Sequence, residues 1–127
     1  MIKFFYVFMG GGVGSLARYL VGMQTLRAFG PSWPYGTFTV NLVGGFLMGL
    51  LVGFLAHRGG GDQERWRVML GVGVLGGFTT FSAFSLETAL MIERRDYGQA
   101  LAYIGASVVF AVGALFIGLM IARKAFA

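Results

Sequence analysis

Side chains that could carry out acid–base, nucleophilic or metal chemistry are scarce in this sequence. Its 127 residues include no cysteine and a single histidine, His57, which lies in a polar stretch. Of the five acidic residues only Glu87 falls within an apolar stretch; the others are Asp62, Glu64, Glu93 and Asp96. Catalysis and metal binding by side chains usually need two or more such groups at one place. We therefore do not expect an enzyme, and without thiols the chain has no disulfide or thiolate metal site.

Uncharged hydrogen-bonding groups are instead concentrated in residues 76–88, GGFTTFSAFSLET. Paired glycines followed by two threonines form helix poorly, and hydroxyl groups can bond backbone groups that a helix break sets free. We predict a break near residues 76–80. Irregular backbone inside a membrane is tolerated only within protein or along an aqueous cavity, so a break there would mark a functional centre. An unbroken packing helix rich in Gly and Thr fits the same pattern, and the sequence leaves both open.

The elements that must position this run are predicted to be membrane-spanning helices. Hydrophobic residues make up 57% of the chain and charged residues 12%, and the mean hydropathy is +0.76. These values are typical of a chain that lies in lipid. A span needs about 20 mostly apolar residues, and the charges leave four such stretches, roughly residues 4–22, 35–56, 68–92 and 98–122. We expect one all-α domain over residues 1–127, in which the apolar N-terminus is the first span and not a signal peptide.

The basic residues lie at the ends of these stretches, where anionic lipid headgroups explain the net charge of +5 better than nucleic acid does. The longest polar connection, residues 57–67, contains three consecutive glycines at 59–61. Four spans put both termini on one side, and that side carries six basic residues: Lys3, Arg58, Arg65, Arg67, Arg123 and Lys124. The other side carries three, Arg27, Arg94 and Arg95, or four if Arg18 near the end of the first span is counted. Because charge bias sets orientation, this small difference leaves insertion in either direction open.

Several residues inside the predicted spans favour helix packing. Glycines recur at intervals of four, which lets helix backbones approach closely: Gly10 and Gly14; Gly45, Gly49 and Gly53; Gly73 and Gly77. Asn41 is typical of a hydrogen bond between helices, and Arg18 of an anchoring or structural charge. Phe81, Phe84 and Thr88 would share one helix face, and phenylalanines at that spacing are usually core or lipid-facing.

Residues 36–45 (GTFTVNLVGG) and 76–88 resemble the two signatures of the Fluc (CrcB) family of fluoride channels. The similarity continues at residues 14–19 and 103–107, so it covers essentially the whole chain. It implies a passive, fluoride-selective channel of the bacterial cytoplasmic membrane that exports fluoride and lowers its cytoplasmic concentration. The implied assembly is an antiparallel homodimer with two pores and a central sodium ion, and a near balance of flanking charges suits such an assembly.

The resemblance also assigns roles to individual residues. The backbone carbonyls of Gly76 and Thr79 would hold the sodium ion, two from each subunit. Phe81 and Phe84 would line the fluoride path with their positive ring edges, and Asn41 would donate amide N–H groups. Further polar groups on the path would come from Ser82, Ser85, Thr88, Tyr103 and Ser107. Ala111 stands where some members have a second serine, which would shorten or alter the polar track. Arg18 and Glu87 are expected to be structural, with Glu87 as the partner of Arg18 or a charge at headgroup level.

Two other functions remain possible at this point. A small four-helix drug/proton exchanger is also a dual-topology dimer, but it needs a carboxylate in its first span, and residues 4–22 contain none. A membrane subunit without transport activity would also suit the glycine pattern.

Fluoride is small and tightly hydrated, so its pore must offer several donors without holding the ion too strongly. Neutral amides, hydroxyls and ring edges meet both requirements.

Overall fold

The computed structural model describes residues 1–58 and 63–126, and all regular structure in these two ranges is helical. Residues 59–62, which include the glycines of the expected polar connection, lie outside the described part. Helix α1 covers Ile2–Phe29, α2 Tyr35–Arg58 and α6 Tyr97–Phe126. Between α2 and α6 the chain forms α3 (Gln63–Trp66), the π-helical segment η2 (Arg67–Leu75), α4 (Gly76–Phe78) and α5 (Ser82–Glu93).

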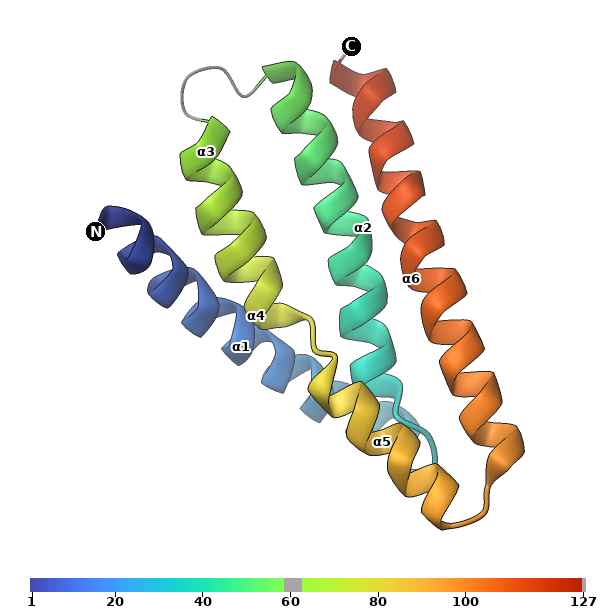
Figure 1. Cartoon of the computed structure of the whole chain (residues 1–127). Helices are drawn as coiled ribbons and strands as arrows, with labels where there is room; N and C mark the ends of the chain where they lie inside the picture. The colour runs from blue at the N-terminus through green and yellow to red at the C-terminus, as the bar shows by residue number, and fades with distance from the viewer. Residues whose placement is uncertain (59–62, 127) are drawn as a thin grey trace.

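Four of these stretches are long and apolar enough to cross a membrane: Ile2–Phe29, Tyr35–Ala56, Gln63–Glu93 and Tyr97–Ala125. The prediction of four spans is therefore confirmed, although the first helix continues seven residues beyond the expected end at residue 22. Figure 1 shows both termini and α3 towards one end of the molecule, and the α1–α2 and α5–α6 connections at the other. Because the outward faces carry large apolar side chains such as Phe4, Phe8 and Leu101, the chain is a multi-pass membrane protein.

The third span is broken where the paired glycines and threonines predicted a break. After α4 the backbone of Thr79 is extended, with φ −85° and ψ 161°, and helix resumes at Ser82. Figure 1 shows the change of direction between α4 and α5. The irregular residues are Thr79–Phe81, so the break lies at the C-terminal edge of the predicted segment. Preceding it, η2 carries an i to i−5 hydrogen bond from the Gly76 N–H to the Gly71 carbonyl, an arrangement that the sequence did not suggest.

The glycine spacing is explained by close contacts between helix backbones. On α2, a Cβ atom at Gly45 would lie 2.8 Å from the Ala111 carbonyl oxygen of α6, and one at Gly49 would collide with that of Leu115. On α1, a Cβ at Gly10 would lie 2.7 Å from the Met69 carbonyl oxygen of η2. These contacts leave no room for larger residues, so the glycines bring α2 against α6 and α1 against the broken third span.

Candidate ion pathway at the helix break

The break diverts two backbone N–H groups to side-chain acceptors. In a continuous helix the Thr80 N–H would bond the Gly76 carbonyl and the Ala83 N–H would bond the Thr79 carbonyl. Instead the Thr80 N–H donates to Asn41 Oδ1 at 2.8 Å, and the Ala83 N–H donates to Thr80 Oγ1 at 3.1 Å. Nothing in residues 1–58 or 63–126 donates to either carbonyl in their place. The Gly76 and Thr79 carbonyls, predicted as sodium ligands, are thus free acceptors.

Asn41 holds the break from helix α2. Besides accepting from the Thr80 N–H, its Nδ2 donates to the Thr80 carbonyl at 3.0 Å, so both backbone groups of Thr80 are bonded to one amide. An amide nitrogen carries two hydrogens, which leaves one N–H of Asn41 for another acceptor. The packing role and the pathway role predicted for Asn41 are therefore compatible.

Arg18 holds the break from helix α1. Its Nε donates to the Gly77 carbonyl at 3.1 Å, which has lost the Phe81 N–H as a helical partner. The expected partnership between Arg18 and Glu87 is wrong: in the described part of the chain, the ion pairs join Glu64 to Lys3 and to Arg67. Opposite charge suggested that pairing, whereas in the structure Arg18 bonds the Gly77 carbonyl that the break sets free.

Glu87 is held by two hydroxyl groups. Thr37 Oγ1 of α2 donates to Glu87 Oε2 at 2.9 Å, and the Tyr103 hydroxyl of α6 donates to Glu87 Oε1, also at 2.9 Å. Tyr103 is fully buried. Sequence reasoning missed Thr37, although it lies in the 36–45 segment that carries the family resemblance. The three residues tie α2, α5 and α6 together beside the break.

The aromatic residues after the break form a short ladder. Phe81 is 77% exposed in the subunit, so it is not a core residue of this chain. Its ring lies 5.5 Å from that of Phe84, centroid to centroid. Phe84 in turn lies 5.0 Å from Tyr103, and Tyr103 meets Trp33 edge-on at 5.2 Å. These successive ring contacts connect Phe81 at the break with Trp33 in the α1–α2 connection.

Of the serine and threonine hydroxyls predicted for the pathway, two are on exposed residues, and the other two are on half-buried ones, Thr88 and Ser107. Ser82 and Ser85 are exposed, and Ser82 Oγ lies 3.2 Å from Thr80 Oγ1. Thr88 Oγ1 donates to the Phe84 carbonyl at 2.8 Å, so its proton is already used within α5. Ser107 Oγ is buried, and no partner for it exists among the described residues. It lies one helical turn after Tyr103, so α6 offers a buried donor beside the ladder.

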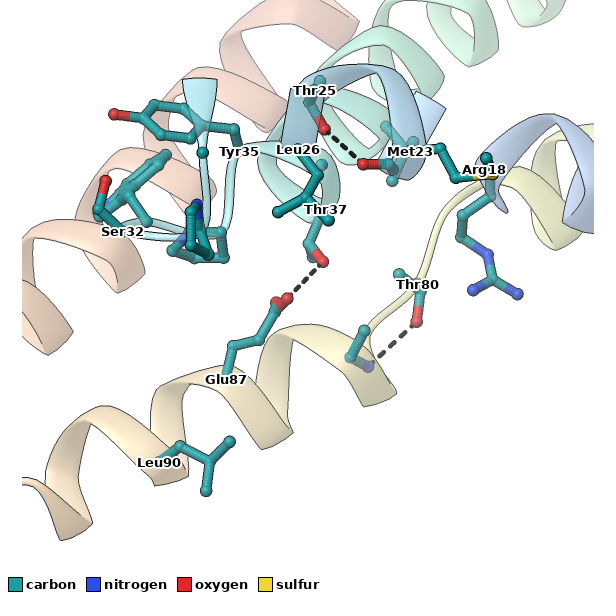
Figure 2. A pocket seen from close by; sticks show the side chains of 18 of the residues that line it. Arg18, Met23, Thr25, Leu26, Ser32, Tyr35, Thr37, Thr80, Glu87 and Leu90 are labelled. Atoms are coloured by element: carbon teal, nitrogen blue, oxygen red, sulfur yellow. Dashed lines mark hydrogen bonds between the residues drawn. The ribbon is translucent and has the colours of Figure 1, made fainter. Parts of the chain in front are cut away.

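A cleft of about 590 Å³ opens towards the break from the end that holds the α1–α2 and α5–α6 connections. Figure 2 shows Arg18 from α1, Thr37 from α2, and Thr80 and Glu87 from the third span around it. Arg94 also lines the cleft, whereas Phe81, Phe84 and Ser107 do not. The cleft can therefore bring water and small ions to Thr80, and of the aromatic ladder only Trp33 lines it.

The sequence matches the family model described as CrcB-like protein, Camphor Resistance (CrcB), over residues 5–119. Among curated relatives, a protein of Caulobacter vibrioides (strain NA1000 / CB15N) named "Fluoride-specific ion channel FluC" is 68% identical over 127 residues, covering 100% of both chains. A protein of the same name from Phenylobacterium zucineum is 69% identical over 118 residues, 93% of each chain. "Fluoride-specific ion channel FluC 2" of Nitrobacter hamburgensis is 50% identical, over 96% of this chain and 98% of its own.

Proposed function

This chain belongs to the CrcB-like protein family, and we propose that it conducts fluoride passively across the membrane as a selective ion channel. The observation that carries this function is the 68% identity, over the full length of both chains, to a relative named a fluoride-specific ion channel. A channel needs no catalytic residues, which agrees with the scarcity of acids, bases and nucleophiles in the spans. The protein is thus a transporter of an ion and not an enzyme.

The fluoride path is proposed to follow the aromatic ladder and the adjacent hydroxyls. Phe81 and Phe84 offer ring edges, which carry the positive part of the aromatic quadrupole. Tyr103 and Ser107 add hydroxyls from α6. The Tyr103 proton is bonded to Glu87, so the unbonded hydroxyl of Ser107 supports this route most directly. Ser82, Ser85 and the second N–H of Asn41 complete the proposed donors, and Thr88 would join them only by giving up its bond to the Phe84 carbonyl. None of these groups carries a positive charge, so an ion that sheds its water here is compensated without being trapped.

A sodium ion is the proposed resident cation, held by the carbonyls of Gly76 and Thr79. The donor set suits it, because both are neutral backbone oxygens without a protein donor in the described ranges. Carbonyls of unwound helix segments coordinate small hard cations in other membrane proteins. Two carbonyls from one subunit are few for such an ion, which favours a site completed by a second copy. Bound there, the cation would neutralise the carbonyl dipoles at the break.

The proposed assembly is an antiparallel homodimer in the bacterial inner membrane, with one pore at each side of the dimer axis. The difference of six basic residues at one end against three at the other, or four with Arg18 included, gives little preference for one orientation. The exposure of Phe81 in the isolated subunit agrees with a pore that a second copy completes. In this assembly fluoride would leave the cytoplasm down its own electrochemical gradient.

The experiment that tests this function is ion efflux from liposomes containing the purified protein. Liposomes loaded with potassium fluoride, made permeable to potassium by valinomycin, should release fluoride at rates far above those of protein-free liposomes. Matched liposomes loaded with potassium chloride should release little chloride. Equal release of both anions would refute selectivity. Absence of fluoride release from a folded protein would favour the exchanger or the non-transporting subunit.

A further inference from the structure

The broken third span leaves backbone carbonyls inside the membrane that require partners. Water is absent from the hydrocarbon, so an unbonded carbonyl there is strongly unfavourable. The Gly77 carbonyl is one of four successive carbonyls, at residues 76–79, that lose their helical donors at the break, and it accepts a hydrogen bond from Arg18 Nε at 3.1 Å. We propose that Arg18 is a positioning residue, which fixes the helix break by bonding the Gly77 carbonyl.

Close packing of helix α1 places Arg18 at this carbonyl. A Cβ atom at Gly77 would lie 2.5 Å from the Gly11 carbonyl oxygen, and one at Gly14 would collide with that of Val74. These glycines therefore bring the backbones of α1 and the third span into contact. Arg18 follows Gly14 by four residues, or about one turn, and so it lies on the same face of α1. The side chain is positioned by rigid backbone contacts and not by a flexible connection.

The surroundings of Arg18 explain how its charge is tolerated. Arginine inside a membrane is unfavourable unless it is hydrogen bonded or reaches water. Here Nε bonds the Gly77 carbonyl, while Arg18 also lines the cleft that opens from the connection end of the molecule. Figure 2 shows its guanidinium group near Thr80. The remaining N–H groups can thus be hydrated from the cleft while Nε holds the backbone.

Arg18 and Asn41 together hold the break from two sides. Asn41 on α2 bonds both backbone groups of Thr80, and Arg18 on α1 bonds Gly77, three residues earlier. All these contacts lie within one subunit, so the break is fixed before any cation or second copy is bound. If sodium binds as proposed above, Arg18 also removes the Gly77 carbonyl from the available ligands, while the carbonyls of Gly76, Phe78 and Thr79 have no donor in the described ranges.

The test measures the geometry of the break directly. The chain contains no cysteine, so Val72→Cys and Ile92→Cys place two spin labels at exposed positions on either side of the break. These positions would be about 30 Å apart along a straight helix, from the rise of 1.5 Å per residue. Labelled subunits are diluted with unlabelled ones, and the distance distribution is recorded by pulsed electron paramagnetic resonance in liposomes.

Arg18→Met removes the donor and the charge, and we expect it to broaden the distance distribution at least twofold and to slow fluoride efflux at least tenfold. Arg18→Lys restores a donor, so it should return the distribution towards the native width. Arg27→Met, an exposed arginine on the same helix, is the matched control and should change neither. Arg18→Leu, which also lacks a donor, is measured in the same way should the Met variant fail to assemble.

An Arg18→Met or Arg18→Leu protein with the native distance distribution would overturn the proposal. If its efflux were nevertheless slow, Arg18 would act on the anion in the cleft and not on the break. The distance measurement does not depend on fluoride transport. A native protein that fails to pass fluoride would therefore refute the proposed function. Broadening in the Arg18 variants would still support the positioning role of Arg18.

Discussion

Isoleucine substitutions at Phe81 and Phe84 separate a packing role from a role in transport. Phe81 is 77% exposed in the subunit and has one ring contact, with Phe84 at 5.5 Å. Phe84 has two, because it also lies 5.0 Å from Tyr103. Isoleucine keeps the side chain apolar and roughly similar in volume, but it has no ring and hence no positive edge. The substitution should therefore reduce the stability of the fold less than it reduces fluoride conduction.

The expected losses of stability follow from these contacts. One aromatic pair contributes about 0.5–1.5 kcal/mol beyond its buried area, and apolar swaps of similar volume usually cost less than about 1.5 kcal/mol. Phe81→Ile should thus reduce the free energy of unfolding by at most about 1.5 kcal/mol. Phe84→Ile, which loses two pairs, should reduce it by about 1–3 kcal/mol. If the ring edges meet fluoride, efflux should fall at least tenfold, which corresponds to about 1.4 kcal/mol in the barrier.

The assay compares thermal unfolding in detergent with fluoride efflux from liposomes, for variants that elute at the same volume as the native protein. Phe8→Ile is the control, because Phe8 on α1 is also 77% exposed and should affect neither quantity. Asn41→Asp, which replaces an amide donor with a repulsive charge, should slow efflux in the same way. If the folded Phe81→Ile and Phe84→Ile proteins show the same fluoride efflux rate as Phe8→Ile, both phenylalanines have a packing role only.

Three further predictions concern assembly and packing. Adding several lysines to the connections on one side of the membrane should force one orientation and abolish efflux. Co-expression with the oppositely biased chain should restore efflux. Full activity of either biased chain alone would contradict the antiparallel dimer. Gly49→Ala sets a methyl group against the Leu115 carbonyl and should destabilise the fold by about 1–3 kcal/mol. Gly105→Ala meets nothing within 4 Å, so equal unfolding temperatures for the two variants would rule out the packing role. Replacing sodium with N-methylglucamine during purification should lower the unfolding temperature of the dimer, and an unfolding temperature independent of sodium would contradict the cation site.

The membrane class, the four spans and the break could be predicted because each depends on a short stretch of sequence. Apolar length decides whether a stretch can cross lipid. The paired glycines and threonines at residues 76–80 weaken helix locally, whatever surrounds them. The spacing of Gly45, Gly49 and Gly53 predicted close packing for the same reason, although the partner helix could not be read from it.

The hydrogen bonds that fix the break could not be predicted, because they join residues far apart in the chain. Asn41 and Thr80 are 39 positions apart, and Arg18 and Gly77 are 59 apart. From the sequence, Glu87 was predicted as a partner of Arg18 because the two charges are opposite. The sequence does not show which backbone carbonyls a helix break sets free. Thr37 was missed for a similar reason, because its hydroxyl matters only through a carboxylate 50 positions away.

The reversal potential of a lipid bilayer containing the purified protein tests the central claim most directly. With a tenfold fluoride gradient and an opposing tenfold chloride gradient across the bilayer, a passive fluoride-selective pore should reverse close to the fluoride equilibrium potential, about 59 mV from zero. The sign should invert when the two solutions are exchanged. Reversal at the chloride potential or near zero would contradict a fluoride-selective channel, as would a current that requires a proton gradient.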